Sequence, residues 1–157
     1  MNHKTCIKAG EKVKDFRLYD QDNNEFILSK YKGKRVLLSF HPLAWTKVCA
    51  DQMKSLEKHW KTFEELNTVA VGLSIDSVPS KKAWAKNLDV NHIKFLSDFW
   101  PHGGIAQQFG LFRNEGYSER ANVIIDENGL VEYVQVYEIS TLPDIDEIVT
   151  ILKTEVD

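Results

Sequence analysis

The sequence lacks the features of several large classes of protein. No apolar run approaches the ~18 residues needed to cross a bilayer. Residues 1–16 also lack the apolar core of a secretory signal. There is no long basic run, and a formal net charge of -3 argues against a nucleic-acid-binding surface. We therefore expect a cytoplasmic protein that binds neither membranes nor nucleic acid.

Cysteine is scarce, since only Cys6 and Cys49 are present. They form no CxxC pair, no zinc pattern and no disulfide framework. The five histidines, from His3 to His102, show no ligand spacing with the cysteines and no HExxH motif. A glycine-rich phosphate loop is also missing. We therefore predict no metal and no other cofactor, with both thiols free in a reducing compartment.

The periodic segments predict one domain over residues 1–157, without repeats or linkers. A polar turn at 20–24 between FRLY and EFIL predicts an N-terminal β-hairpin, and the DENG turn at 126–129 predicts a second hairpin. The other expected strands and helices follow from apolar runs and helical spacing. The expected strands are 36–40, 69–75, 93–96, 121–125 and 130–136, and the expected helices are 50–66, 81–88, 105–109 and 144–152.

This order of elements is typical of an α/β protein. Strand, helix, strand and helix are followed by an antiparallel hairpin and a last helix. That succession predicts a central mixed β-sheet flanked by helices on both faces. The thioredoxin-like fold fits the pattern.

The stretch FHPLAWTKVCADQ places Cys49 where a strand gives way to a helix. Unpaired backbone N–H groups and the helix dipole favour an anion there, and therefore a thiolate. The hydroxyl of Thr46 can accept or donate hydrogen bonds, and Pro42 stiffens the loop. The same spacing equally suits an inert core cysteine preceded by a plain helix cap at Thr46. The residues alone leave both interpretations open.

The pattern Pro42-x-x-x-Thr46-x-x-Cys49 resembles the active-site signature of the peroxiredoxins, which are thiol peroxidases. Other stretches resemble that family in the same order: AWAK around Trp84, FLSDFWPHG at 95–103, FG at 109–110 and RANVIIDENG at 120–129. The resemblance runs from about Gly10 to the end of the chain. The motif FLSDFWPHG, together with the lack of a second cysteine near Cys49, resembles most the one-cysteine, AhpE-type branch.

The resemblance implies a role for each matching residue. Cys49 matches the peroxidatic cysteine, whose thiolate attacks the terminal peroxide oxygen and becomes a sulfenic acid. Thr46 matches the hydroxyl that orients the peroxide, and Pro42 matches the residue that shields the pocket. Arg120 matches the arginine beside the sulfur, where a permanent cation would stabilise the thiolate and the leaving oxygen. Without the resemblance, Arg120 would be interpreted as a surface residue in a salt bridge.

Three aromatic residues are also candidates for the substrate pocket: His41, Trp45 and Trp84. His41 equally suits a packed position at the end of a strand. In the resembling family, residues near Trp45 and Trp84 line the pocket and the dimer contact. An apolar wall there would suit organic hydroperoxides, and the resemblance implies a homodimer.

The chain departs from the family pattern close to Cys49. Lys47 and Ala50 stand where many members carry proline, and Gln52 stands where many carry glutamate. Lys47 adds a positive charge, which either helps the anion or points to solvent. Glutamine can hydrogen-bond to Arg120 but does not neutralise its charge. We therefore predict a site at least as favourable to the thiolate as one with glutamate.

The oxidised sulfur must be reduced before the next turnover. No cysteine follows Cys49, and Lys54 occupies the resolving position of the short-helix type. We therefore expect an external thiol to act as reductant: a low-molecular-weight thiol, thioredoxin or a glutaredoxin-like protein. Cys6 as an atypical resolving residue is the alternative. Two other functions stay open, namely a peroxide-sensing redox relay and a chaperone-like assembly on the same fold.

Overall fold

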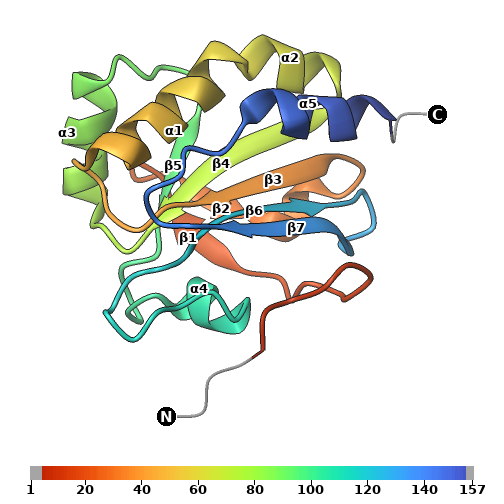
Figure 1. Ribbon diagram of the computed structural model, residues 1–157, viewed down its shortest axis with the longest axis horizontal. Coiled ribbons are helices and arrows are strands. Elements are labelled where there is room, and N and C mark those ends of the chain that lie inside the picture. The colour runs from red at the N-terminus through yellow and green to blue at the C-terminus, as the bar shows by residue number, and fades with distance from the viewer. Residues whose placement is uncertain (1–4, 155–157) are drawn as a thin grey trace.

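A mixed seven-stranded sheet forms the centre of the structure, a computed structural model in which residues 5–154 are described (Figure 1). The strand order is β2-β1-β5-β4-β3-β6-β7. The strands are β1 (Arg17–Tyr19), β2 (Glu25–Ile27), β3 (Arg35–Phe40), β4 (Thr68–Ser74), β5 (Lys94–Ser97), β6 (Arg120–Ile125) and β7 (Val131–Tyr137). The helices are α1 (Lys47–Lys58), α2 (Trp60–Glu65), α3 (Val78–Asn87), α4 (Gly104–Gln108) and α5 (Ile145–Thr154), with a 3-10 turn η1 (Leu28–Tyr31).

The pairing of the strands confirms the predicted topology. Strands β3, β4 and β5 are parallel, so helical crossovers connect them. Strand β6 runs antiparallel to β3 and forms a hairpin with β7. The β1–β2 hairpin turns at Asp20, whose carboxylate accepts hydrogen bonds from two backbone amides of the turn. Helices α1, α2, α3 and α5 lie on one side of the sheet and α4 lies on the other (Figure 1).

Two helices differ from their predicted bounds. The expected helix at 50–66 begins earlier, at Lys47, and is interrupted at His59, where φ is -107° and ψ is 14°. The expected helix at 81–88 begins earlier, at Val78, and therefore includes Pro79, which lies outside the expected bounds. Proline suits the first helical turn because its missing N–H would have no partner there.

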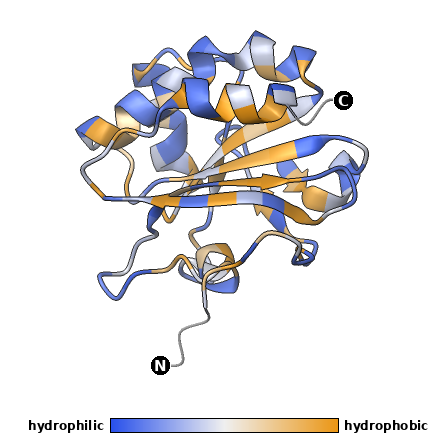
Figure 2. Cartoon of the chain, turned by 45° about the vertical axis from the view of Figure 1, so that its right-hand side comes forward, coloured by the Kyte–Doolittle hydropathy of each residue, from blue (hydrophilic) through white to orange (hydrophobic). Residues whose placement is uncertain are grey.

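The sheet divides the hydrophobic core into two layers. On β3, Leu38 and Phe40 pack in the layer that contains α4 and the N-terminal segment, here called the α4-side layer. Leu37 packs in the layer that contains α1, α3 and α5, here called the α1-side layer. This alternation is the period of a β-strand, and hydrophobic residues are concentrated along the strands (Figure 2). Cys6 packs against the α4-side layer and Cys49 belongs to the α1-side layer, so the two thiols lie on opposite faces of the sheet.

Helix α1 packs closely against the sheet at Gly72 of β4. A Cβ atom at Gly72 would lie 2.4 Å from Sδ of Met53 and 3.2 Å from Cε1 of His41. A side chain at this position of β4 would therefore require Met53 to move. Its absence lets Met53 of α1 reach the strand, which holds the start of the helix near the end of β3.

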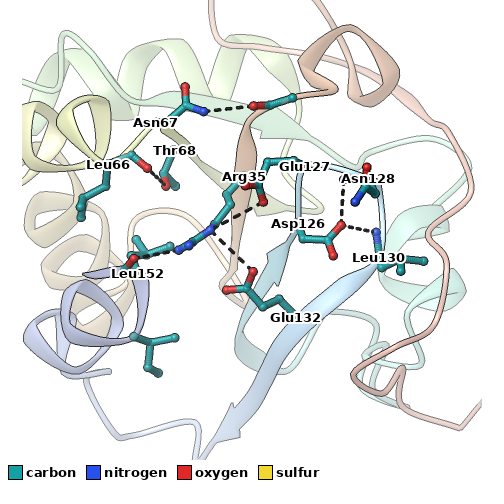
Figure 3. A network of polar contacts seen from close by, with 12 residues as sticks. Arg35, Leu66, Asn67, Thr68, Asp126, Glu127, Asn128, Leu130, Glu132 and Leu152 are labelled. Carbon is teal, nitrogen blue, oxygen red and sulfur yellow. Dashed lines mark hydrogen bonds and ion pairs between the residues drawn. The ribbon is translucent and has the colours of Figure 1, made fainter. Parts of the chain in front are cut away.

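A buried arginine joins three elements at the other end of β3 (Figure 3). Nη1 of Arg35 donates to the carbonyl oxygen of Leu152 in α5 at 2.9 Å. Its Nε lies 3.6 Å from a carboxylate oxygen of Glu132 and 3.9 Å from one of Glu127. A cation at the end of a helix also complements the helix dipole. Arg35 thus connects β3, the β6–β7 hairpin and the last turns of α5.

Candidate active site

The loop between β3 and α1 is held against the connection between β4 and α3. The backbone amide of Ala44 donates to Asp76 at 2.8 Å, and Nε1 of Trp45 donates to the hydroxyl of Ser80 at 3.1 Å. Trp45 has φ of 71°, in the left-handed region that side chains rarely adopt. Pro42 is buried in the same loop. These restraints fix the path by which the chain enters α1.

Cys49 is the third residue of α1, and its side chain is fully buried. The first backbone bond of the helix runs from the amide of Ala50 to the carbonyl of Thr46. The N–H groups of the three preceding residues therefore have no intrahelical acceptor. The first turn contains no acidic residue. The positive end of the helix dipole is thus left to stabilise an anion at Cys49.

Arg120 reaches the sulfur from β6. Its side chain is on the α1 side of that strand, and Nη1 lies 3.3 Å from Sγ of Cys49. The same nitrogen donates to Oε1 of Gln52 at 2.8 Å, and Nε donates to the carbonyl of Ile139 at 2.9 Å. Among the ion pairs of residues 5–154, none includes Arg120. Its charge therefore meets neutral oxygens and the sulfur.

Gln52 is held in one orientation by its other contacts. Its Nε2 donates to the hydroxyl of Ser39 at 2.7 Å and to the carbonyl of Phe40 at 3.2 Å. Because the amide nitrogen is used by β3, the amide oxygen faces Arg120. The substitution of glutamine for the family's glutamate thus gives the guanidinium a partner without a counter-charge.

Thr46 occupies the N-cap position of α1 but does not cap the helix through its side chain. Its hydroxyl donates to the carbonyl of Leu43 at 2.8 Å. The hydroxyl hydrogen is therefore occupied, and the oxygen is left to accept. A hydroperoxide carries an O–H donor that this oxygen can bind.

A pocket of about 310 Å³ opens beside these residues. Arg120 both lines the pocket and contacts Cys49, so the sulfur lies one side chain away from the pocket. Access of a peroxide to the fully covered sulfur requires local movement of the intervening side chains. The lining residues are Pro42, Leu43, Thr46, Lys47, Val48, Tyr117, Arg120, Ile139 and Ser140.

The three aromatic residues predicted to line the pocket, His41, Trp45 and Trp84, are not among its lining residues. His41 and Trp84 are buried together in the core, with ring centres 5.4 Å apart. Trp45 turns outward to Ser80. Tyr117 and the segment at 139–140 take their place, and no local sequence signal indicates that these distant segments meet.

Lys47 is also placed by the structure. Its side chain is 87% exposed and forms an ion pair with Asp51 at 3.1 Å. The lysine therefore points to solvent at the rim of the pocket and is partly neutralised there. The fixed charge beside the sulfur is that of Arg120.

Comparison with known proteins decides the family. Residues 9–134 match the model of the AhpC/TSA family. The chain belongs to this family. It is 34% identical over 131 residues to alkyl hydroperoxide reductase E of Mycobacterium tuberculosis, covering 82% of this chain and 85% of that protein. It is 33% identical over 150 residues to peroxiredoxin 2 of Thermoplasma acidophilum, covering 92% and 74% of the two chains.

Solved peroxiredoxin structures share the fold. The reduced 2-Cys peroxiredoxin of Plasmodium vivax superposes with a TM-score of 0.84 at 30% identity, over 92% of this chain and 80% of that chain. The peroxidoxin BcpB of Mycobacterium tuberculosis gives 0.84 at 28% identity, over 95% and 98%. The thioredoxin-like fold is therefore confirmed, and the protein is a peroxiredoxin, a thiol-dependent peroxidase.

Two further features concern residues 5–154, the part of the chain that the structure describes. No group of three or more His, Cys, Asp or Glu side chains in this range is arranged to hold a metal ion. His3 lies outside the described residues. No helix in the same range is long and apolar enough to cross a membrane.

Proposed function

We propose that this peroxiredoxin reduces hydrogen peroxide and organic hydroperoxides by a one-cysteine mechanism, with Cys49 as the peroxidatic residue. The observation that supports the proposal is the 3.3 Å contact between Nη1 of Arg120 and Sγ of Cys49. Among the ion pairs of residues 5–154, none joins this guanidinium to a carboxylate. A thiolate is the nucleophile in thiol chemistry. Both the helix start and the guanidinium favour that form.

The reaction uses each residue in turn. Thr46 accepts the O–H of the hydroperoxide and aims its terminal oxygen at the sulfur. The thiolate of Cys49 donates an electron pair to that oxygen as the O–O bond breaks, giving a sulfenic acid and an alkoxide or hydroxide. Arg120 stabilises the charge as it moves from sulfur to the leaving oxygen, which takes a proton from water. An external thiol then attacks the sulfenic sulfur, water leaves, and a second thiol releases Cys49 as the reduced form.

Cys6 is poorly placed to replace the external thiol within one chain. It is half-buried against the α4-side layer, while Cys49 lies in the layer on the other side of the sheet. The segment is also fixed, because Ile7 donates to the carbonyl of Phe109 at 2.9 Å. Burial, followed by the charges of two nearby carboxylates, raises the pKa of the Cys6 thiol. A disulfide needs Cα atoms within roughly 7 Å, so Cys6 would have to leave its site.

The apolar part of the pocket supports organic hydroperoxides as substrates. Leu43, Val48, Tyr117 and Ile139 line it beside the polar groups of Thr46 and Arg120, and the names of the mycobacterial relatives specify alkyl hydroperoxides. A low-molecular-weight thiol, thioredoxin or a glutaredoxin-like protein would serve as reductant. The cytoplasmic location and the homodimer stay predictions from the sequence and the family resemblance.

Mass measurement after one equivalent of peroxide tests the mechanism. We expect a single added oxygen on both the intact protein and Cys6→Ser, and none on Cys49→Ser. A loss of two hydrogens that depends on Cys6 would instead establish Cys6 as the resolving residue. Turnover with a general thiol distinguishes a peroxidase from a redox relay, since a relay would be oxidised without turning over.

A further inference from the structure

A fully buried lysine lies on the core side of the active site. Lys81 of α3 has no exposed surface, although lysine is rarely buried unless it is paired. Among the ion pairs of residues 5–154, none includes Lys81. Its Nζ lies 3.5 Å from Nε2 of His41 and 5.7 Å from the centre of the Phe95 ring. An imidazole and an aromatic face thus hold this cation without a carboxylate in contact.

The contacts of His41 require one protonation state. Nδ1 lies 3.3 Å from the carbonyl oxygen of Ser39, which can only accept, so Nδ1 carries the hydrogen. Nε2 is then the acceptor for the ammonium of Lys81. Burial, followed by the charge of Lys81, holds the pKa of His41 well below its usual range. A neutral His41 therefore fixes the position of Lys81 and adds no charge of its own.

The charges of three acidic groups on different elements act on Lys81. Burial lowers the Lys81 pKa to about 7, while the charges of Asp76, Cys49 and Asp98 act in the opposite direction. Asp76 is already bound by a backbone amide and a serine hydroxyl, and Asp98 by two backbone amides of α4. Of these three groups, Cys49 is the proposed nucleophile of the peroxidase reaction. Because electrostatic interaction is mutual, a thiolate that stabilises the ammonium is stabilised by it.

We propose that Lys81, held by His41, is a positioning residue for the peroxidase reaction, whose buried ammonium favours the Cys49 thiolate from the core side while Arg120 does so from the pocket side. The inference rests on Cys49 being the peroxidatic residue. Lys81 has no exposed surface and is not among the pocket-lining residues, so it acts through charge and not through contact with the peroxide.

The pH dependence of this effect has a defined sign. Since the pKa of Lys81 is about 7, its charge is present below that pH and is lost above it. Asp98, whose pKa burial raises to about 6, becomes neutral below that value. The charge of Lys81 therefore acts on Cys49 below about pH 7, where protonation of Asp98 removes a competing anion, and its influence is lost in alkaline solution.

Rapid-mixing measurements of peroxide oxidation across pH test the proposal with Lys81→Met and Lys81→Arg. We expect Lys81→Met to oxidise about five- to tenfold more slowly at pH 6, corresponding to a shift of up to one pH unit in the rate profile, and to equal the wild type at alkaline pH. Lys81→Arg keeps the charge and should restore most of the rate. The matched control is Lys82→Met, which removes an exposed lysine from the same helix. A Lys81→Met profile that is unshifted, or lowered equally at every pH, would overturn the proposal.

A reciprocal measurement keeps the proposal testable if Lys81→Met does not fold. The pKa of Lys81 followed by NMR must fall in Cys49→Ser, because the interaction of two sites is the same in both directions. An unchanged lysine pKa would refute the coupling. The proposed function has a separate test. Peroxidase activity that is retained in Cys49→Ser would refute the proposed function, whatever the pKa of Lys81.

Discussion

Arg35 and Arg120 are two buried arginines with different surroundings. They are 4% and 2% exposed, and each donates to a backbone carbonyl. Arg35 lies near the carboxylates of Glu132 and Glu127. Arg120 meets the amide oxygen of Gln52 and the sulfur of Cys49. The first cation is neutralised by permanent anions, whereas the second has a neutral partner and a group that can become an anion.

This difference separates a structural role from a chemical one. A buried charge needs compensation, and Arg35 obtains it from two nearby carboxylates. Arg120 obtains it most fully when Cys49 is a thiolate. Since no carboxylate of residues 5–154 forms an ion pair with Arg120, a thiolate at Cys49 is the anion that compensates this charge. The fold therefore favours the reactive form of the cysteine.

Removing the charge of Arg120 should produce the largest effect. Arg120→Met takes away the cation beside the sulfur and the leaving oxygen, so we expect peroxide oxidation of Cys49 to slow by about 10²- to 10³-fold. The free energy of unfolding should change far less. Rapid-mixing kinetics and denaturant unfolding on the same preparation check both parts. A variant that unfolds readily but reacts normally would reverse the assignment of roles.

The matched change at Arg35 should lower the free energy of unfolding and leave the oxidation rate unchanged. Arg35→Met removes the hydrogen bond to Leu152 and the ion-pair contacts with Glu132 and Glu127. We expect a loss of about 3 kcal/mol in the free energy of unfolding. The oxidation rate of the folded protein should be unchanged, because β3 separates this cluster from Cys49. A slower reaction in fully folded Arg35→Met would contradict the separation.

Lys81 extends the comparison to a buried cation without a carboxylate in ion-pair contact. Burial lowers its pKa from an ordinary value of 10.5 to about 7. Between these values the unfolded chain binds more protons than the folded chain, so stability rises with pH. We expect the difference in unfolding free energy between wild type and Lys81→Met to change in favour of wild type by about 3.5 kcal/mol from pH 7 to pH 10. Unfolding curves whose difference is independent of pH would argue against a lowered pKa of Lys81 in the fold.

Gln52→Glu gives Arg120 a carboxylate partner like that of Arg35. The new anion should compete with the sulfur for the guanidinium, so we expect a decrease in the oxidation rate near neutral pH of about tenfold or less. The rate–pH profile measures this change. Gln52→Leu removes the amide without adding charge and serves as control. An increase in rate for Gln52→Glu would show that neutral surroundings do not favour the thiolate.

The sequence predicts the secondary-structure elements of this site better than the residues that line its pocket. Regular alternation and helical spacing predict the strands and most helices, and the strand-to-helix transition places Cys49 in the first turn of α1. The proximity of Arg120 follows from the family resemblance, since 71 residues separate it from Cys49. The pocket wall at Tyr117 and Ile139 depends on how distant loops meet, which no local pattern encodes. The contact of Lys81 with His41 also depends on tertiary packing, because the two residues lie on different elements.

The thiolate absorbance of Cys49 at neutral pH, measured in wild type and Arg120→Met with Cys49→Ser as the blank, tests the central claim most directly. We predict a larger thiolate fraction of Cys49 in the wild type than in Arg120→Met, because the guanidinium lies beside the sulfur. A thiolate fraction in the wild type no greater than that of a free cysteine, or an equal fraction in both proteins, would contradict the role given to the unneutralised guanidinium.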